Sequence, residues 1–111
     1  MVRPVQVERG DVWLVDLDPV VGSEIQKTRP CVVVSPLELH GHLRTAIVAP
    51  MTTKGRPAPF RVPVSFMGRE GLILLDQVRT VDKARLASKA GTLPSRTLRN
   101  ALLTLQEIFA D

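Results

Sequence analysis

Short apolar segments, separated by prolines, glycines and polar loops, make up most of the chain. Strands in small β-rich domains have this length and this punctuation. Six segments show the apolar run or the apolar–polar alternation of a strand, and they cover residues 11–18, 31–35, 45–49, 60–65, 71–75 and 77–81. The last two are predicted as separate strands or as one strand bent around Asp76. Pro63 lacks an amide hydrogen, so residues 60–65 are expected at a sheet edge or in a bulge.

The period of the apolar positions becomes helical after Pro94-Ser95, which supplies a stop and a helix N-cap. A helix is predicted over about residues 96–110, with one apolar stripe that packs on the sheet: Leu98, Ala101, Leu102, Leu105, Ile108 and Phe109. Leu103 lies off this stripe and is expected to be partly exposed or at a subunit contact. The pattern predicts one mainly β domain over residues 1–111, a small, strongly bent antiparallel sheet with a C-terminal α-helix.

The composition is that of a folded protein. Hydrophobic residues make up 44% of the 111 residues, which argues against disorder. No apolar run approaches the roughly 20 residues that a membrane span needs, and Met1–Pro4 lack the apolar segment of a secretory signal. The protein is therefore expected in the cytoplasm. Cys31 is the one cysteine; it lies in an apolar run and is expected in the core rather than as a nucleophile.

Positive charge is concentrated late in the chain. The net charge is +4, but residues 54–99 hold ten basic and three acidic side chains, whereas residues 1–53 carry −1 and residues 100–111 carry −2. Arginine dominates, and its planar guanidinium suits phosphate. This basic block, residues 54–99, fits a nucleic-acid partner or a solubilising surface. Aromatic residues are scarce, so charge and hydrogen bonds, not stacking on several rings, would have to hold RNA.

Two loops are candidates for a functional site. Residues 22–30 contain Arg29, whose extended backbone before Pro30 places its side chain where a strand begins. Residues 50–56 follow an apolar strand and offer two hydroxyls and two cations that suit a phosphate: Thr52, Thr53, Lys54 and Arg56. From these residues alone, an ordinary solvated loop is the better interpretation of both segments.

A third polar set, Asp76-Gln77 with Arg79-Thr80, interrupts apolar sequence. A carboxylate in such surroundings is either paired with a cation or functional, and structural pairing is the better interpretation. Metal ligation is poorly supported, because His40, His42 and Glu38 form one cluster in a polar loop without a second. No phosphate-binding loop or nucleophile motif is present, and no spacing favours either histidine as a general base.

Short motifs follow one another in a fixed order along residues 8–110: Arg9-Gly10-Asp11, Asp18-Pro19, Gly22-Ser23-Glu24, Thr28-Arg29-Pro30, Ala49-Pro50-Met51-Thr52-Thr53, Asp76-Gln77-Val78-Arg79-Thr80 and Lys83-Ala84-Arg85. In order and spacing they resemble the MazF/PemK toxins, the mRNA interferases of type II toxin–antitoxin systems. No single motif is decisive, but their common order makes a chance resemblance improbable.

The resemblance implies an SH3-like barrel shared with the CcdB toxins, with a C-terminal helix. It implies a homodimer that binds single-stranded mRNA across the subunit interface, and a cognate MazE-like antitoxin whose acidic tail blocks that groove. It also implies endoribonuclease activity without a metal or other cofactor. In that chemistry a 2′-hydroxyl attacks the adjacent phosphate, which gives 2′,3′-cyclic phosphate and 5′-hydroxyl ends.

Site residues follow from the same resemblance. Arg29 would stabilise the charged phosphate and Thr52 would hydrogen-bond to it, as the catalytic pair. The remaining candidates for RNA binding are polar or charged residues of the segments above: Glu24, Lys27, Thr53, Lys54, Arg56, Asp76, Gln77 and Arg79. The PemK branch uses a histidine, an arginine and an aspartate where this chain has Ser23, Leu74 and Asp76, so the chain resembles the MazF branch and its general base is not identified.

Two other functions remain as alternatives. One is a CcdB-like poison of DNA gyrase, which acts through a terminal tryptophan that this chain lacks. The other is a non-catalytic SH3-like module that binds RNA. If the protein cleaves RNA, base selection is expected in the loops at residues 37–44 and 54–60.

Overall fold

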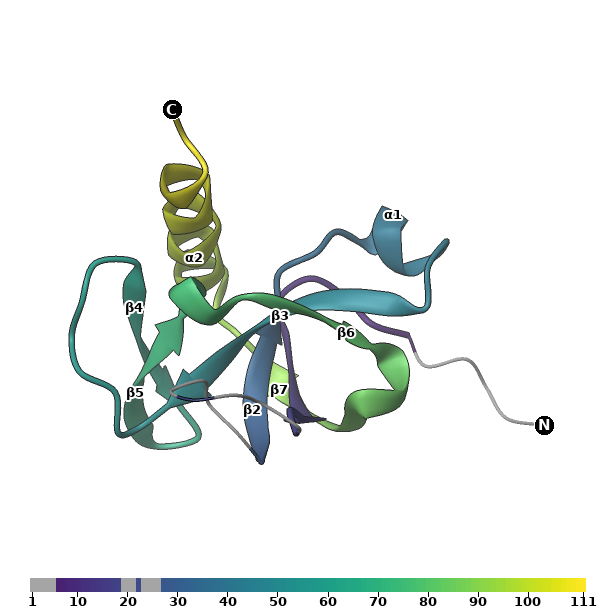
Figure 1. Cartoon of the computed structure of the whole chain (residues 1–111). Helices are drawn as coiled ribbons and strands as arrows, with labels where there is room; N and C mark the ends of the chain where they lie inside the picture. Colours follow the sequence, from purple (N-terminus) through teal and green to yellow (C-terminus); the bar gives the residue numbers. More distant parts are fainter. Residues whose placement is uncertain (1–5, 19–21, 23–26) are drawn as a thin grey trace.

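Seven antiparallel strands form one sheet in the computed structural model, which describes residues 6–18, 22 and 27–111 (Figure 1). The strands are β1 (Asp11–Asp16), β2 (Thr28–Val33), β3 (Thr45–Thr52), β4 (Arg61–Phe66), β5 (Arg69–Leu74), β6 (Arg79–Asp82) and β7 (Leu86–Thr92). The helical elements are α1 (Leu37–His40), the short 3-10 turns η1 (Leu75–Gln77) and η2 (Lys83–Arg85), and α2 (Ser95–Ile108). The predicted class, a mainly β sheet with a C-terminal helix, is confirmed.

The sheet bends around β3 without closing into a complete barrel. Its order is β4-β5-β3-β2-β1-β7, and β6 pairs separately with β3. One edge of β3 pairs with β2, while the other pairs first with β6, at Thr45–Val48, and then with β5, at Met51 and Thr52. The turn η1 carries the chain between β5 and β6. The two segments around Asp76 are therefore separate strands, and Pro63 lies in the edge strand β4, as predicted.

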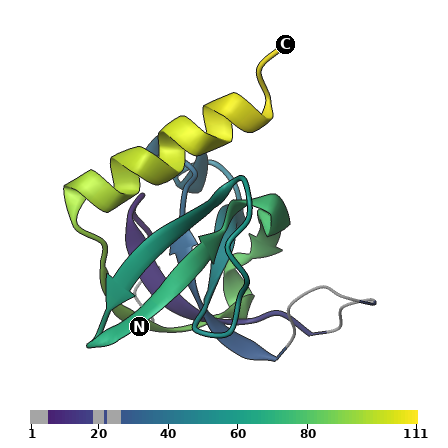
Figure 2. The same cartoon turned by 90° about the vertical axis from the view of Figure 1, so that its left-hand side faces the viewer.

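Two apolar cores form on opposite sides of the sheet because alternate residues of a strand point to opposite faces. On β1, Trp13 and Val15 belong to one core, together with the buried Cys31. Val12 belongs to the other core, which α2 covers with its half-buried stripe of Leu98, Leu102, Leu105 and Ile108. Figure 2 shows α2 lying across this face of the sheet. The prediction that Cys31 lies in the core is confirmed.

The helix α2 begins and ends slightly earlier than predicted. Pro94 occupies the N-cap position and Ser95 is the first helical residue, so Ser95 is not the cap. Because the helix ends at Ile108, Phe109 leaves the apolar stripe and is exposed, contrary to the sequence prediction. Leu103 is exposed, as its position off the stripe predicted. No helix in the described part of the chain is long and apolar enough to cross a membrane.

His40 lies in the interior, where the sequence predicted a polar loop. Residues 37–40 form α1, and the His40 ring reaches back to two segments of the chain. Its Nδ1 lies 2.8 Å from the carbonyl oxygen of Val7, and its Nε2 lies 2.5 Å from Ser35 Oγ, which accepts the amide hydrogen of Ile47. Both ring nitrogens are thus occupied in a structural network, which explains why burial of this polar side chain is tolerated.

Candidate functional site

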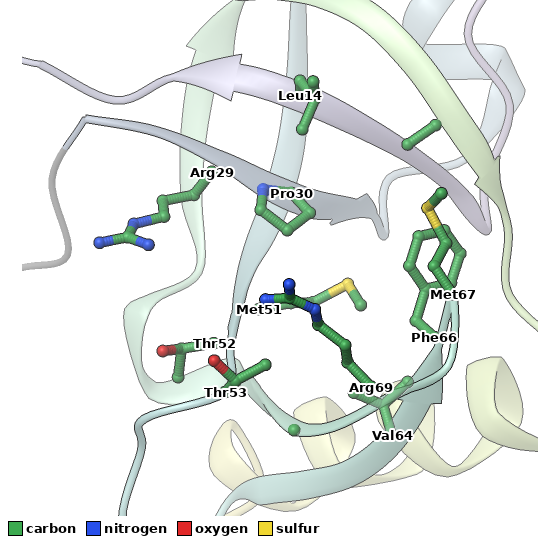
Figure 3. Close-up of a pocket in the computed structure, with 12 residues that line it drawn as sticks. Leu14, Arg29, Pro30, Met51, Thr52, Thr53, Val64, Phe66, Met67 and Arg69 are labelled. Atoms are coloured by element: carbon green, nitrogen blue, oxygen red, sulfur yellow. The ribbon is translucent and has the colours of Figure 1, made fainter.

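A pocket of about 370 Å³ opens on the sheet face that α2 covers elsewhere (Figure 3). All strands except β6 contribute side chains to it. The lining residues are Leu14, Arg29, Pro30, Met51, Thr52, Thr53, Val64, Phe66, Met67, Arg69, Gly71 and Ala90. The incomplete closure of the sheet creates this opening, since the β4–β5 hairpin lies opposite β1, β2 and β7 without pairing to them.

One end of the pocket is polar and cationic. Arg29 is the second residue of β2 and is half-buried, opposite Val15 of β1. Thr52 is the last residue of β3 and is also half-buried, and Thr53 follows it on the surface. A guanidinium and two hydroxyls at one place can supply charge-assisted and neutral hydrogen bonds to the oxygens of a phosphate. The structure thus brings together the predicted catalytic pair and one predicted RNA-binding residue, Thr53.

The loop after Thr52 turns back sharply over its side chain. The Thr52 hydroxyl accepts a hydrogen bond from the Lys54 amide at 3.1 Å. Gly55 lies so close that a Cβ atom there would be 2.9 Å from Thr52 Cγ2. The methyl group of Thr52 is held against Gly55, and its hydroxyl is held by the backbone of the loop. Local structure therefore restricts the rotamer of Thr52.

Arg69 is a pocket residue that the sequence analysis missed. It begins β5 and extends into the pocket toward Met51 and Pro30 (Figure 3). Its position depends on the turn at Met67-Gly68, where both residues have positive φ, 51° and 76°. Two consecutive positive φ angles are typical of a tight hairpin turn. A hairpin turn could have been predicted here, because Met67 is followed by a glycine between two segments with a strand pattern. The predicted strand, however, began at residue 71 and so left out Arg69.

The other end of the pocket is apolar. Side chains from three neighbouring strands form its floor: Leu14, Pro30 and Met51. Val64, Phe66 and Met67 of the β4–β5 hairpin form one wall, and Ala90 of β7 also lines the pocket. Met67 keeps 76% of its surface exposed, which is unusual for a methionine in a small folded domain.

Several predicted RNA-binding residues do not line the pocket: Lys27, Lys54, Arg56, Asp76, Gln77 and Arg79. Glu24 lies outside the described residues. Arg79 donates a hydrogen bond to the Leu17 carbonyl at 3.2 Å, which gives it a structural partner. Lys27 has a positive φ of 70°, and its amide donates to Asp18 Oδ1 at 2.9 Å.

Asp76 is paired with Arg61, so the predicted pairing of this carboxylate with a cation is confirmed. Arg61 Nε lies 3.0 Å from Asp76 Oδ1 and Arg61 Nη2 lies 3.1 Å from Asp76 Oδ2, so the two side chains form a bidentate ion pair. Nη1 of Arg61 also donates to the carbonyl oxygen of Arg56 at 3.3 Å. The hydrogen bonds that Arg61 donates to Asp76 raise the pKa of Arg61 above its ordinary value. Arg61 therefore connects the loop after Thr52 to the turn η1.

The basic block divides into cations that hold the fold and cations that face solvent. Arg85 donates to the carbonyl oxygens of Asp16 and Asp18, and Lys89 forms an ion pair with Asp11 at 3.2 Å. Lys83 donates to the carbonyl of His40. Besides Lys89, the exposed cations of the block are Lys54, Arg56, Arg69, Arg96 and Arg99. Fewer cations of the basic block are therefore available to an anionic partner than its ten basic side chains suggest.

The described residues provide neither a metal site nor a reactive thiol. Across residues 6–18, 22 and 27–111, no three His, Cys, Asp or Glu side chains lie close enough to hold a metal ion. Burial raises the pKa of Cys31 to about 12, so its thiol stays protonated near neutral pH. The chemistry of the pocket is that of arginine and threonine side chains.

Comparison with known proteins gives a consistent set of relatives. Residues 8–109 match the family model described as PemK-like, MazF-like toxin of type II toxin–antitoxin system. The chain is 37% identical over 113 residues to "Endoribonuclease PemK" of Escherichia coli, covering 96% of this chain and 85% of that protein. It is 40% identical over 89 residues to "Endoribonuclease EndoA" of Bacillus subtilis, covering 75% and 77%.

Solved structures share the fold. The crystal structure of MazF (Form-I) from Deinococcus radiodurans superposes with a TM-score of 0.84 at 24% identity, covering 95% of this chain and 97% of that one. The crystal structure of MazE-MazF (Form-II) from the same organism gives a TM-score of 0.78 at 21% identity, covering 96% and 98%. At this level of identity the likeness concerns the fold, which is the bent sheet with its C-terminal helix.

Proposed function

The chain belongs to the PemK-like, MazF-like toxins of type II toxin–antitoxin systems, and from this premise we propose that it cleaves single-stranded RNA without a metal ion. The observation that carries the proposal is the meeting of Arg29 and Thr52 at one end of a pocket. Relatives that match across most of the chain are named endoribonucleases. The arginine–threonine pair supplies the positive charge and the hydrogen-bond donor that such a reaction needs at the phosphate.

In the proposed mechanism, the 2′-hydroxyl of one nucleotide loses its proton and attacks the adjacent phosphorus. The bond to the 5′-oxygen of the next nucleotide breaks, and this oxygen takes up a proton. The products are a 2′,3′-cyclic phosphate and a 5′-hydroxyl end. Negative charge on the phosphate oxygens grows in the transition state, and fixed cations and hydrogen-bond donors that face this charge lower the barrier. Arg29 and Arg69 supply the positive charge that a metal ion supplies in other nucleases.

Arg29 acts electrostatically in this scheme rather than as the general acid. An arginine side chain keeps its proton below a pH of about 12, so it is a poor proton donor to the leaving oxygen. The Thr52 hydroxyl donates a hydrogen bond to a phosphate oxygen. Asp76 is not assigned as the general base, because both of its carboxylate oxygens accept hydrogen bonds from Arg61.

The partners follow from the same premise. We propose that the protein works in the cytoplasm as a homodimer and is inhibited by a cognate antitoxin with an acidic tail. A disordered acidic segment can wrap a large surface and fold on binding. The exposed cations near the pocket, Lys54, Arg56 and Arg69, suit its carboxylates as well as they suit RNA phosphates.

Incubation of the purified protein with a long, defined RNA in excess EDTA tests the proposed function. We expect cleavage to persist, the new 5′ ends to accept a label from polynucleotide kinase directly, and a deoxyribose at the scissile position to abolish the cut. Loss of cleavage on chelation would contradict metal independence. RNA binding without cleavage would favour a non-catalytic RNA-binding module, and inhibition of DNA gyrase without RNA cleavage would favour a gyrase poison.

A further inference from the structure

The apolar floor of the pocket is a continuation of the core that α2 covers. That core includes a row of buried side chains on three neighbouring strands: Val12, Val32 and Ala49. Two residues further along the same strands, on the same face, lie Leu14, Pro30 and Met51. No residue of α2 lines the pocket, so the helix leaves this second row open. Leu14 and Pro30 are half-buried and Met51 is buried, so the row forms the floor of a pocket. An apolar surface that the rest of the fold leaves open in this way marks a binding site.

The hairpin wall beside this floor has a fixed part and an adaptable part. The Phe66 ring is half-buried against β7, since a Cβ atom on Gly91 would lie only 3.0 Å from Phe66 Cζ. Met67 stands beside it at the tip of the hairpin and is mostly exposed (Figure 3). An unbranched thioether adapts its shape to a flat ligand and makes favourable contacts with aromatic faces. Together they form a surface suited to a planar ring.

The two ends of the pocket differ in charge, which restricts the kind of ligand. Arg29, Thr52 and Thr53 lie at one end and Phe66 and Met67 at the other, while Arg69 extends between them. A nucleotide combines a phosphate with a flat ring of low polarity on its faces, and single-stranded bases are bound by stacking on aromatic, apolar and guanidinium surfaces. The volume of about 370 Å³ lies in the range of small-ligand pockets.

We propose that the apolar end of the pocket binds the base of one nucleotide next to the scissile phosphate. This proposal rests on the proposed function, because it takes the ligand to be RNA. The hairpin residues Phe66, Met67 and Arg69 then select the base, in place of the loops at residues 37–44 and 54–60. No residue of either loop lines the pocket, and α1 lies on the opposite side of the sheet from the β4–β5 hairpin (Figure 1).

A binding experiment tests the subsite independently of catalysis. Short RNAs are built around a mapped cleavage site, with a deoxyribose at the scissile position that prevents the reaction. In each RNA one nucleotide near that position is made abasic, and its affinity is compared with that of the intact oligonucleotide. We expect one abasic position, adjacent to the scissile phosphate, to weaken binding to the unmodified protein about tenfold, as loss of one stacked base does.

Two variants locate the effect in the pocket. Met67→Ser removes the exposed wall, and Ala90→Leu places a larger side chain in the pocket from β7. Both variants should remove most of the loss of affinity at that one position, which is the abasic penalty. Phe109→Ser is the matched control, because Phe109 is 75% exposed, close to the 76% of Met67, and lies outside the pocket. It should keep the full penalty. Circular dichroism of each variant checks that the fold is retained.

The outcomes separate the two proposals. An abasic penalty that stays the same in Met67→Ser and Ala90→Leu would overturn the base subsite, even if the protein cleaves RNA. If sedimentation shows that Met67→Ser dissociates a dimer and leaves the penalty unchanged, the apolar end is covered by a second copy instead. A position-specific penalty that the two variants remove, in a protein that fails to cut unmodified RNA, would support the subsite and contradict only the proposed catalysis.

Discussion

Gly71 brings the backbone of β5 directly against the carbonyl of Thr52. A Cβ atom on Gly71 would lie 2.5 Å from the Thr52 carbonyl oxygen and 3.6 Å from Thr53 Cα. The adjacent residue of β5, Leu72, pairs with Thr52 in the ladder. This close approach holds the end of β3 in place, and with it the hydroxyl that faces the cationic end of the pocket. The absence of a side chain at position 71 is therefore a condition for the geometry of the site.

Gly71→Ala should reduce both stability and RNA cleavage. The contacting atoms belong to the backbone of β3 and cannot rotate away, so the strands must separate. Overpacking of this kind costs roughly 1–3 kcal/mol in the free energy of unfolding, and a displacement of about 1 Å at a reacting group can lower the rate by about 10²-fold. Urea unfolding and initial cleavage rates measure the two effects.

Gly41→Ala is the matched control for this substitution. Gly41 has a negative φ of −73°, and a Cβ atom there would meet only ordinary contacts of 3.8–3.9 Å. We expect unchanged cleavage and a stability that is equal or slightly higher. If Gly71→Ala retained the wild-type rate, the position of Thr52 would not depend on this close approach.

Arg29→Ala should remove cleavage and leave the fold intact. The side chain emerges at the start of β2 and is only half-buried, so the cores lose little. Loss of one charge-assisted contact to a transition state lowers the rate by about 10²–10³-fold. Thr52→Ala should cost somewhat less, because it removes a neutral hydrogen bond. Arg96→Ala, at an exposed arginine outside the pocket, serves as the control. A wild-type rate in Arg29→Ala would contradict the assignment.

The sequence predicted the elements whose apolar pattern is strong. Most strands and α2 lie within a few residues of their expected bounds, because burial on one or both faces leaves a clear period. The strand β7, Leu86–Thr92, was missed because most of its residues are polar or small and exposed, and its place depends on pairing with β1. Burial of His40 was also missed, since it depends on contacts with distant Val7 and Ser35.

The candidate site was only partly predictable for the same reason. Arg29 precedes one segment with a strong apolar pattern and Thr52 follows another, so their location at the end of the sheet could be expected. Arg69 enters the pocket only because the Met67-Gly68 turn folds β5 back toward β3. The partner of Asp76 is Arg61, fifteen residues away, and no local pattern connects the two. Tertiary contacts of this kind cannot be deduced from the order of residues alone.

Asp76→Asn should lower cleavage without changing the shape of its pH dependence. In our interpretation Asp76 positions Arg61, which holds the carbonyl of Arg56 in the loop after Thr52. An exposed ion pair contributes about 1 kcal/mol or less to stability, so the fold should persist. The expected loss of rate is smaller than the roughly 10²-fold that a full 1 Å displacement causes. The rate is measured across a range of pH.

Exchanging the charges of Arg61 and Asp76 distinguishes a positioning role of Asp76 from a role in proton transfer. The double variant Arg61→Asp with Asp76→Arg can rebuild the ion pair and should recover part of the activity that each single variant loses. A general base at position 76 would give a different result: Asp76→Asn would remove the acidic limb of the pH–rate profile, and the exchanged pair would stay inactive. That result would overturn the positioning role.

Cys31 should make the protein less stable at alkaline pH. Burial favours the neutral thiol and raises the pKa of Cys31 from its ordinary value of 9.0 to about 12 in the folded state. Because the folded-state pKa lies above the unfolded one, this contribution to stability is complete below pH 9.0 and is lost as the pH rises toward about 12. Denaturant unfolding at increasing pH should therefore show a steeper loss in the wild type than in Cys31→Ala. Equal slopes would mean that the thiol titrates normally in the folded protein.

RNA and an acidic antitoxin segment should compete for the cationic end of the pocket. Both present several negative charges, and Arg29, Arg69 and the Lys54–Arg56 loop can hold only one such chain at a time. Single-stranded RNA binding then weakens with salt, with a slope of about 0.7 per phosphate contact on logarithmic axes. Arg29→Ala should lower that slope by about the value of one contact, and Arg96→Ala should leave it unchanged.

Cleavage should stop when the protein encoded by the open reading frame next to this gene is added. Sedimentation at micromolar concentration should show a dimer. A partner that binds tightly while cleavage continues would show that it acts away from the pocket, because one occupied cationic end excludes the other ligand.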